Sequence, residues 1–205
     1  MRLIGLVIAI AALTAATLVT TAGAGPLDAP GYTKSFTCSA CHGFAGNSTS
    51  GTMPILAGAN PGYFKKQIQS FATGKRPSPE MEPYAKMVLE LGVDDVASYF
   101  AAQTRIPTPV KVDSAAAARG KHSAVTCANC HGPDGKGHPA PTSDAMRLIP
   151  SVAGQAPGYL KLQIQAFRDG KRNPGEPLVE EMRTIMKNLS DAAIDDIIAY
   201  YSTVK

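Results

Sequence analysis

Apolar positions recur at helical spacing in two matching stretches of the chain. The first, residues 60–74, opens with Asn60 and Pro61, typical of an N-cap followed by a first-turn proline, and closes at Gly74. The positions that recur three and four residues apart are Tyr63, Gln67, Ile68 and Phe71. Residues 157–170 repeat the pattern from a proline to a glycine. Each stretch therefore predicts an amphipathic helix.

Two further stretches of the chain also predict helices. Residues 94–103 and 190–203 are amphipathic, and each carries aspartates near its start, where the helix dipole favours negative charge. No run of alternating polar and apolar residues is long enough to predict a strand. The pattern as a whole predicts an all-α fold.

These helices belong to an internal duplication. PILAGANPGYFKKQIQSFATGKR, residues 54–76, matches PSVAGQAPGYLKLQIQAFRDGKR, residues 150–172, at a shift of 96 positions. DDVASYF from Asp94 matches DDIIAYY from Asp195 at a shift of 101. The changes in shift place two insertions in the second copy, one before Pro150 and one after its GKR. Because insertions belong in surface loops, both segments are predicted to be loops.

The duplication divides the chain into two domains after a targeting segment. Residues 1–24 resemble a secretory signal peptide, because Arg2 precedes an apolar run that ends in an A-x-A site at Ala24. An uncleaved N-terminal anchor is the alternative. The first domain is expected over residues 25–104 and the second over 113–205. The linker, RIPTPVKV at residues 105–112, contains two prolines that break any helix.

The charge balance argues against nucleic acid as a partner. The chain has 20 Lys and Arg against 16 Asp and Glu, a net charge of +4, and neither sign forms a long run. Phosphate binding needs a clustered basic face, which this distribution lacks. After the N-terminal segment, no apolar stretch is long enough to span a membrane.

Small helical lobes with long Pro/Gly loops have little apolar material for a core, and this chain contains no Trp. Something other than side chains is therefore expected to fill each lobe.

The candidate chemistry lies in FTCSACHG, residues 36–43. On a helical turn Cys38, Cys41 and His42 present two thiols and an imidazole together. A thioredoxin-like redox pair would need βαβ patterning and would give the histidine no role. Structural zinc would have to gather ligand pairs from separate repeats. Covalent haem attachment uses both thiols and places the histidine on the iron.

The motif recurs 89 positions later as VTCANCHG, residues 125–132, which contains Cys127, Cys130 and His131. Haem attachment at two copies of the motif accounts for all four cysteines of the chain and for the expected export. It also accounts for the small apolar core, because a haem is a large apolar group held by covalent bonds. We therefore predict two haem c groups, with His42 and His131 as axial ligands of iron.

The second axial ligand should occupy equivalent positions in both copies, and methionine is a frequent partner of histidine in electron-transfer haems. Met81 and Met182 are separated by 101 positions, the shift of the final helices. The pairs that fall out of register are Met87 with Met186 and Met53 with Met146. We predict Met81 and Met182 as ligands, with gap-filling core methionines as the alternative.

Other basic residues have less specific interpretations. Arg76 and Arg172 could pair with haem propionates, but each also follows a helix end, where a basic residue is favoured anyway. His122 and His138 have no counterparts in the first copy and are expected at the surface.

Taken together, these motifs resemble the cytochrome c4 family. They are the paired CxxCH motifs, LAGANPGY and VAGQAPGY, QIQSF and QIQAF, the GKR, and the terminal ASYF and IAYY. The resemblance covers nearly all of residues 30–203. It implies two tandem class I cytochrome c domains, each wrapped around one covalently bound haem, and histidine/methionine ligation in both. The chain departs from the LAGQ signature at Ala59, whereas Gln155 keeps it. Two different reduction potentials are therefore expected.

The resemblance also implies further contacts within each domain. An early helix would cross the terminal helix, with Gly31 and Gly120 allowing close approach. The carbonyls of Pro54 and Pro150 would orient the two histidines and fix their tautomers.

The function implied is that of a periplasmic electron carrier rather than an enzyme, because an iron whose six coordination positions are all filled has none open for substrate. Its expected partners are membrane respiratory complexes that oxidise quinol and a terminal oxidase, with peripheral membrane association as an option. Two alternatives remain open. One is a dihaem electron-transfer subunit of a flavoprotein dehydrogenase, and the other is a small dihaem enzyme with one open iron.

Overall fold

The computed structural model describes residues 27, 29, 31–137 and 148–205. The expected signal segment, residues 1–24, lies outside the described part of the chain. Within that part the regular secondary structure is entirely helical, as the pattern predicts. No described helix is long and apolar enough to cross a membrane.

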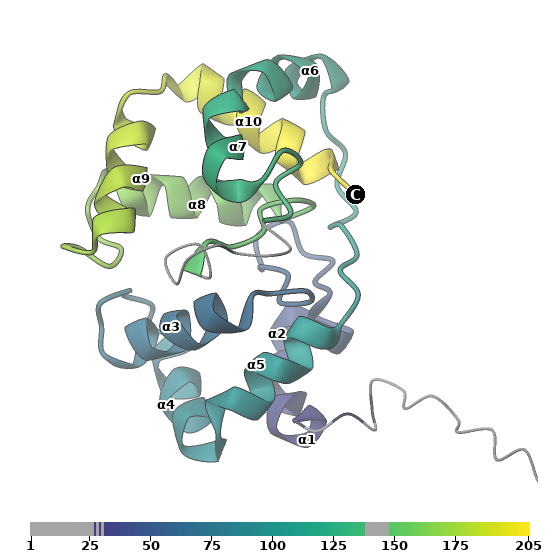
Figure 1. The fold of residues 1–205 in the computed structure, drawn as a ribbon. Coiled ribbons are helices and arrows are strands. Elements are labelled where there is room, and N and C mark those ends of the chain that lie inside the picture. Colours follow the sequence, from purple (N-terminus) through teal and green to yellow (C-terminus); the bar gives the residue numbers. More distant parts are fainter. Residues whose placement is uncertain (1–26, 28, 30, 138–147) are drawn as a thin grey trace, which may run out of the picture.

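The helices form two lobes, stacked one above the other in Figure 1. The lower lobe contains α1 (Tyr32–Ser35), η1 (Phe36–Cys38), α2 (Ser39–His42), η2 (Phe44–Gly46), α3 (Pro61–Ala72), α4 (Met81–Leu91) and α5 (Val93–Ala102). The upper lobe contains α6 (Ser114–Ser123), α7 (Val125–His131), α8 (Pro157–Arg168), α9 (Pro177–Lys187) and α10 (Asp191–Thr203). Helices α3 and α8 lie on the facing sides of the two lobes.

Helix starts follow the capping chemistry in the sequence. The side chain of Asn60 accepts hydrogen bonds from the backbone of Gly62 at 2.9 Å and of Tyr63 at 3.2 Å, which satisfies free donors at the start of α3. Ser190 caps α10 in the same way through the backbone of Ala193 at 3.2 Å. The four predicted helices are thus confirmed to within two residues at each end. The pattern provides no bounds for α4 and α9.

The early helix of each lobe crosses the terminal helix at a glycine. A Cβ atom at Gly31 would lie 2.7 Å from the carbonyl carbon of Asp95 in α5. A Cβ atom at Gly120 would lie 2.9 Å from the backbone nitrogen of Ile197 and would overlap the carbonyl of Asp196 in α10. The close approach that the family resemblance implies is therefore present at both crossings.

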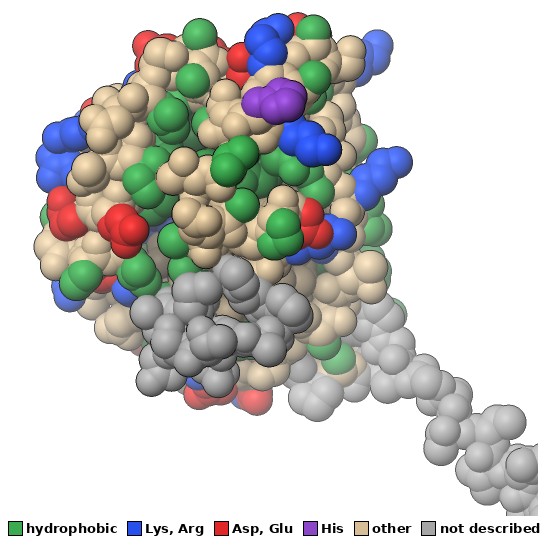
Figure 2. Space-filling model, turned by 45° about the horizontal axis from the view of Figure 1, so that its top comes forward, with side chains coloured by type: hydrophobic (Ala, Val, Ile, Leu, Met, Phe, Trp, Pro, Cys, Tyr) green, Lys and Arg blue, Asp and Glu red, His purple; other side chains and the backbone are tan. Residues whose placement is uncertain are grey.

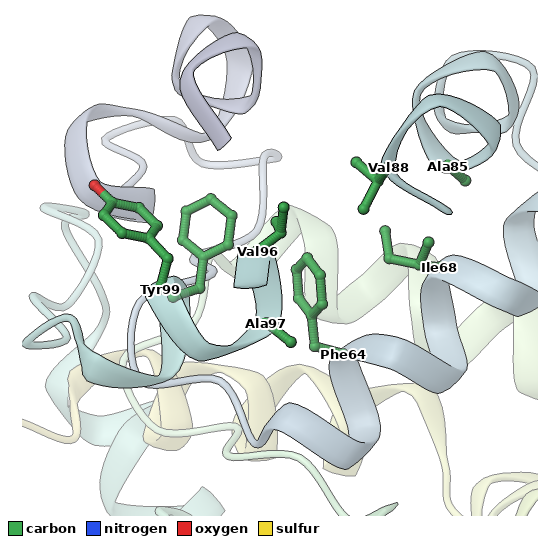
Figure 3. Close-up of a cluster of buried hydrophobic side chains, with 8 residues drawn as sticks. Phe64, Ile68, Ala85, Val88, Val96, Ala97 and Tyr99 are labelled. Carbon is green, nitrogen blue, oxygen red and sulfur yellow. The ribbon is translucent and has the colours of Figure 1, made fainter. Parts of the chain in front are cut away.

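The two lobes differ in how much core their side chains supply. In the first lobe the buried cluster, drawn in Figure 3, comprises Phe64, Ile68, Ala85, Val88, Val96, Ala97, Tyr99 and Phe100. The second-lobe cluster comprises only Ala124, Ile197 and Tyr201. Helix α3 buries four of its residues, whereas its counterpart α8 buries none. The expectation of a missing core therefore fits the second lobe better than the first.

The segment between the two lobes is held by hydrogen bonds to both of them. Residues 104–113 contain no helix, and their backbone reaches both lobes. Ile106 donates to Asn47 Oδ1 at 2.7 Å in the first lobe, and Thr108 donates to the Gly154 carbonyl at 3.0 Å in the second. This segment is thus fixed to both lobes through residues 105–108.

The insertion after the second GKR is a loop, as predicted, and Pro174 and Gly175 are exposed, but its first residue is not at the surface. Asn173 is 1% exposed, and its Nδ2 donates to Ser70 Oγ of the first lobe at 2.6 Å. Its backbone nitrogen donates to the Lys75 carbonyl at 2.7 Å. Asn173 is buried because it lies in the junction between the lobes. Much of the other insertion, residues 138–147, lies outside the described residues.

Charges of both signs are mixed on the face shown in Figure 2, where hydrophobic side chains occupy the middle and charged side chains lie mostly along the margin. Matching pairs recur in the two lobes. Lys65 contacts Asp94 at 2.8 Å, and Lys161 contacts Asp195 at 2.8 Å. This mixing agrees with the argument against a nucleic-acid partner.

Candidate haem sites

Each Cys-x-x-Cys-His sequence folds into a helical turn. In the first lobe η1 and α2 carry Cys38, Cys41 and His42, and in the second lobe α7 carries all three equivalents. A glycine with positive φ follows each histidine, Gly43 at +77° and Gly132 at +80°, and ends the turn. The turn thus presents two thiols and an imidazole as one unit, as the spacing predicts.

The two histidines are held by backbone carbonyls. Nδ1 of His42 lies 2.9 Å from the Pro54 carbonyl oxygen, and Nδ1 of His131 lies 2.8 Å from that of Pro150. A carbonyl only accepts hydrogen bonds, so Nδ1 carries the proton in each ring. Burial lowers the pKa of His42, which opposes its protonation. The ring of His42 is therefore suited to bind iron through Nε2.

One continuous cavity of about 740 Å³ extends across both lobes. Its wall includes all six side chains of the two motifs: Cys38, Cys41, His42, Cys127, Cys130 and His131. The apolar side of α8 also lines it, through Leu160 and Ile164. The sparse second-lobe core therefore opens onto the space that the two motifs share.

The predicted methionines line the same cavity. Met81 is the first residue of α4, and Met182 lies in the middle of α9. Met87 packs on the first-lobe core and is not part of the cavity wall. Met186 is buried and lines the cavity one helical turn after Met182. Met53 also reaches the wall, and Met146 lies outside the described residues.

The first cysteine of each motif is held as a thiol. Burial raises the pKa of Cys38 and of Cys127. The hydroxyl of Tyr201 is hydrogen-bonded to Cys127, where the first lobe has Phe100 in the equivalent position. All four cysteines are free. The described residues contain no group of three or more His, Cys, Asp and Glu side chains that could hold a metal ion by themselves.

Arg105, the first residue of the linker, is a half-buried cation that sequence reasoning missed. It lines the cavity and donates to the carbonyls of Ala57 at 3.1 Å and Ala153 at 2.8 Å, one in each lobe. Burial lowers the pKa of its guanidinium to about 10. Its position at the start of a proline-rich linker carries no sequence signal for this role.

Arg76 and Arg172 are also buried, and both reach across the junction between the lobes. Arg76 donates to Tyr159 Oη at 2.9 Å and to Gln163 Oε1 at 2.7 Å. Arg172 donates to Tyr63 Oη at 2.6 Å. Each guanidinium also lies over a phenylalanine ring of its own lobe, at 4.4 and 4.5 Å from the centroid. Their hydrogen-bond partners in the described residues are all uncharged.

These residues fit haem. The shared cavity is largely apolar, and it presents two thiol pairs and two histidines. Three guanidiniums, those of the buried Arg76 and Arg172 and the half-buried Arg105, line it without a carboxylate partner among the described residues. A buried cation without a counter-charge is costly, and an anionic group would relieve that cost. Haem supplies vinyl groups for the thiols, an iron for the histidine and propionates for the guanidiniums.

The chain is similar to known proteins over most of its length. A family model described as cytochrome c matches residues 117–205. Cytochrome c4 from Pseudomonas aeruginosa is 33% identical over 180 residues, which are 84% of this chain and 86% of the relative. A thiosulfate dehydrogenase electron acceptor from Stutzerimonas stutzeri is 32% identical over 178 residues, 82% of this chain and 78% of the relative. The crystal structure of reduced cytochrome c4 from Pseudomonas stutzeri superimposes with a TM-score of 0.73 at 28% identity, covering 85% of this chain and 97% of that one.

Proposed function

The chain belongs to the cytochrome c4 family, and on that premise we propose that it is a periplasmic carrier of two electrons with histidine/methionine ligation in both lobes. It is a haem c protein with the class I cytochrome c fold. The observation that carries the proposal is the single cavity that joins two Cys-Cys-His turns with Met81 and Met182. The two tandem domains are proposed at residues 25–104 and 113–205, after a signal peptide at 1–24.

The protein side chains have distinct roles in this proposal. The thiols of Cys38 and Cys41 would hold one haem through its two vinyl groups, and those of Cys127 and Cys130 would hold the second, each by addition of S–H across C=C without a leaving group. The Pro54 carbonyl holds the Nδ1 proton of His42, which leaves Nε2 as the ring nitrogen that would bind iron. When bound, each haem supplies a one-electron Fe(III)/Fe(II) couple.

With one histidine and one methionine from the protein and four nitrogens from the porphyrin, each iron would have no position left for a substrate. His42 with Met81, and His131 with Met182, are the proposed axial pairs. Electrons then enter and leave through the protein surface near each Cys-x-x-Cys-His turn, where Cys41 is exposed. The proposed partners are a membrane complex that oxidises quinol and a terminal oxidase.

The test is an absorption spectrum of the exported protein in both oxidation states, with carbon monoxide added to the reduced form. We expect two haem c groups per chain, the far-red band of iron–methionine ligation in the oxidised form, and no change with carbon monoxide. Binding of carbon monoxide to one haem would instead identify an open iron and an enzyme.

A second candidate function is that of electron acceptor for a sulfur-oxidising enzyme. The Stutzerimonas stutzeri relative, whose name assigns it to thiosulfate dehydrogenase, favours this candidate. The two candidates differ in the donor. Rapid reduction by a thiosulfate dehydrogenase, together with slow reduction by a quinol-oxidising complex, would select the second. Co-purification with a flavin-bearing subunit would instead identify the flavoprotein partner considered from the sequence.

A further inference from the structure

Gln155 of the second lobe pairs with the backbone of the first lobe beside His42. Its Oε1 accepts a hydrogen bond from the Ile55 backbone nitrogen at 2.8 Å, and its Nε2 donates to the Ile55 carbonyl at 3.2 Å. Both residues are buried, with Gln155 5% and Ile55 3% exposed. Oε1 also accepts from the backbone nitrogen of Ala156 at 3.0 Å. The backbone donors and acceptor fix which end of the amide is oxygen.

The Ile55 N–H belongs to the same peptide unit as the Pro54 carbonyl, and that carbonyl accepts from His42 Nδ1 at 2.9 Å. Hydrogen bonds in a chain polarise one another, which strengthens each by roughly 10–30% in condensed-phase estimates. When Gln155 accepts from the N–H side of this amide, it makes the C=O side a better acceptor. The chain of contacts thus runs from Gln155 through one peptide bond to the histidine ring.

We infer that Gln155 is a positioning residue by which the second lobe lowers the reduction potential of the first haem. The inference rests on the proposed role of His42 as an axial ligand. A stronger acceptor at Nδ1 gives the imidazole more imidazolate character and raises its basicity as a ligand. A more basic ligand stabilises Fe(III) over Fe(II), because the oxidised iron carries the larger positive charge.

The peptide unit that holds His131 in the second lobe has no glutamine of the first lobe at the equivalent position. The position equivalent to Gln155 is Ala59, which has no side-chain acceptor, and the amide equivalent to Ile55 is that of Ser151. The carbonyl of Pro150 therefore holds His131 without a glutamine amide on the other side of its peptide unit. The two histidine sites therefore differ in this contact across the junction.

The experiment compares the dihaem protein with its Gln155→Met and Gln155→Ala variants. Methionine keeps the length of the side chain without the amide, and alanine is the residue at the equivalent place in the first lobe. The potential of each haem is measured by an NMR-monitored redox titration, in which haem methyl signals are assigned to a lobe by their contacts. Solvent exchange of the His42 Nδ1 proton is measured in the reduced protein.

We expect the potential of the first haem to rise in both variants, with faster exchange of the Nδ1 proton and an unchanged second haem. The matched control is Ser70→Ala, which removes the inter-lobe hydrogen bond from Asn173 and leaves the Pro54 peptide untouched. The control should leave both potentials unchanged.

Three outcomes would overturn the inference: an unchanged first haem, an equal shift of both haems, or the same shift in the Ser70→Ala control. The last two would point to general loosening of the junction. Failure of the proposed function is recognised separately, because the unaltered protein would then lack two haems with histidine/methionine ligation.

Discussion

The backbone of Asp196 lies where the side chain of any residue other than glycine at position 120 would begin. Helix α6 crosses α10 at this point, and a Cβ atom would also lie 2.9 Å from the Ile197 nitrogen. The helices must separate to admit a methyl group, and such overpacking costs about 2 to 3 kcal/mol. We therefore predict that Gly120→Ala lowers the free energy of unfolding by about that amount, measured by denaturant titration.

Gly51→Ala is the control for this substitution, because nothing lies within 4 Å of the added Cβ atom and the backbone there is not left-handed. It should leave the free energy of unfolding nearly unchanged. Equal losses in both variants would show that the α6–α10 crossing is not responsible.

Met81→Ala should open the first haem. Removal of the thioether leaves that iron with a free sixth position, so we expect half of the far-red band to be lost, carbon monoxide to bind one haem, and the potential of that haem to fall. Met87→Ala is the matched control, because Met87 packs on the core outside the cavity. An unchanged spectrum in Met81→Ala would contradict the assignment of Met81 as an iron ligand.

In the second lobe the same comparison uses Met182→Ala and Met186→Ala. Both side chains line the cavity, and only Met182 has a partner in register in the first copy. We expect loss of the far-red band of the second haem in Met182→Ala alone. Its loss in Met186→Ala instead would reassign the ligand by one helical turn.

Replacement of both cysteines of one motif should remove one haem. The double variant Cys127→Ala with Cys130→Ala retains the first motif, so haem content, measured as the pyridine haemochrome, should fall from two groups per chain to one. The second lobe should lose more stability than the first does in the corresponding Cys38→Ala with Cys41→Ala variant, because its own core is smaller. Retention of two covalently bound haems would contradict the assignment.

Arg105→Met should lower both reduction potentials. The guanidinium lies on the wall of the shared cavity and bonds to both lobes, so its positive charge disfavours the oxidised, more positive state of each iron. Lys111→Met removes the same charge from an exposed position of the linker and should change neither potential appreciably. Similar shifts in the two variants would mean that only net charge matters.

Acid should weaken the α6–α10 crossing through Asp196. Its carboxylate accepts from Arg119 Nε at 2.8 Å and Nη2 at 2.7 Å, and these hydrogen bonds lower the pKa of Asp196 below its ordinary value of 3.8. The unfolded state therefore binds a proton first as the pH falls, so this contribution is present above the ordinary pKa and is lost below it.

The measurement is the difference in unfolding free energy between the unaltered protein and Asp196→Asn, as a function of pH. We expect the difference to be largest near neutral pH, to shrink as the pH drops through the lowered pKa, and to weaken with added salt. A difference independent of pH would exclude the carboxylate charge as its source.

Much of the fold is predictable because the sequence pattern occurs twice, so that each copy checks the prediction made from the other. The two copies of the first helix pattern give α3 and α8 the same bounds in register, and Asn60 and Ser190 mark helix starts through local hydrogen bonds. The histidine contacts with Pro54 and Pro150 follow from the family resemblance, and the structure contains both. Local chemistry and internal repetition are sufficient for these features.

Contacts between the lobes could not be predicted. Gln155 is visible in the sequence only as a retained signature residue, and its partner Ile55 lies 100 positions away. Asn173 lies in a loop whose composition is typical of the surface, yet this residue is buried against the first lobe. Such contacts depend on how the two folded lobes pack against each other. The helix pattern within one lobe contains no information about that packing.

The junction of Arg76 and Arg172 has the form of an isologous interface. Arg76 bonds to Tyr159 while Arg172 bonds to Tyr63, so each copy offers the other the same pair of residues. This reciprocity is characteristic of a twofold homodimer. A linker that keeps the two copies at high effective concentration favours the docked arrangement even where the self-association is weak. The present chain thus holds two copies of one cytochrome surface against each other within a single polypeptide.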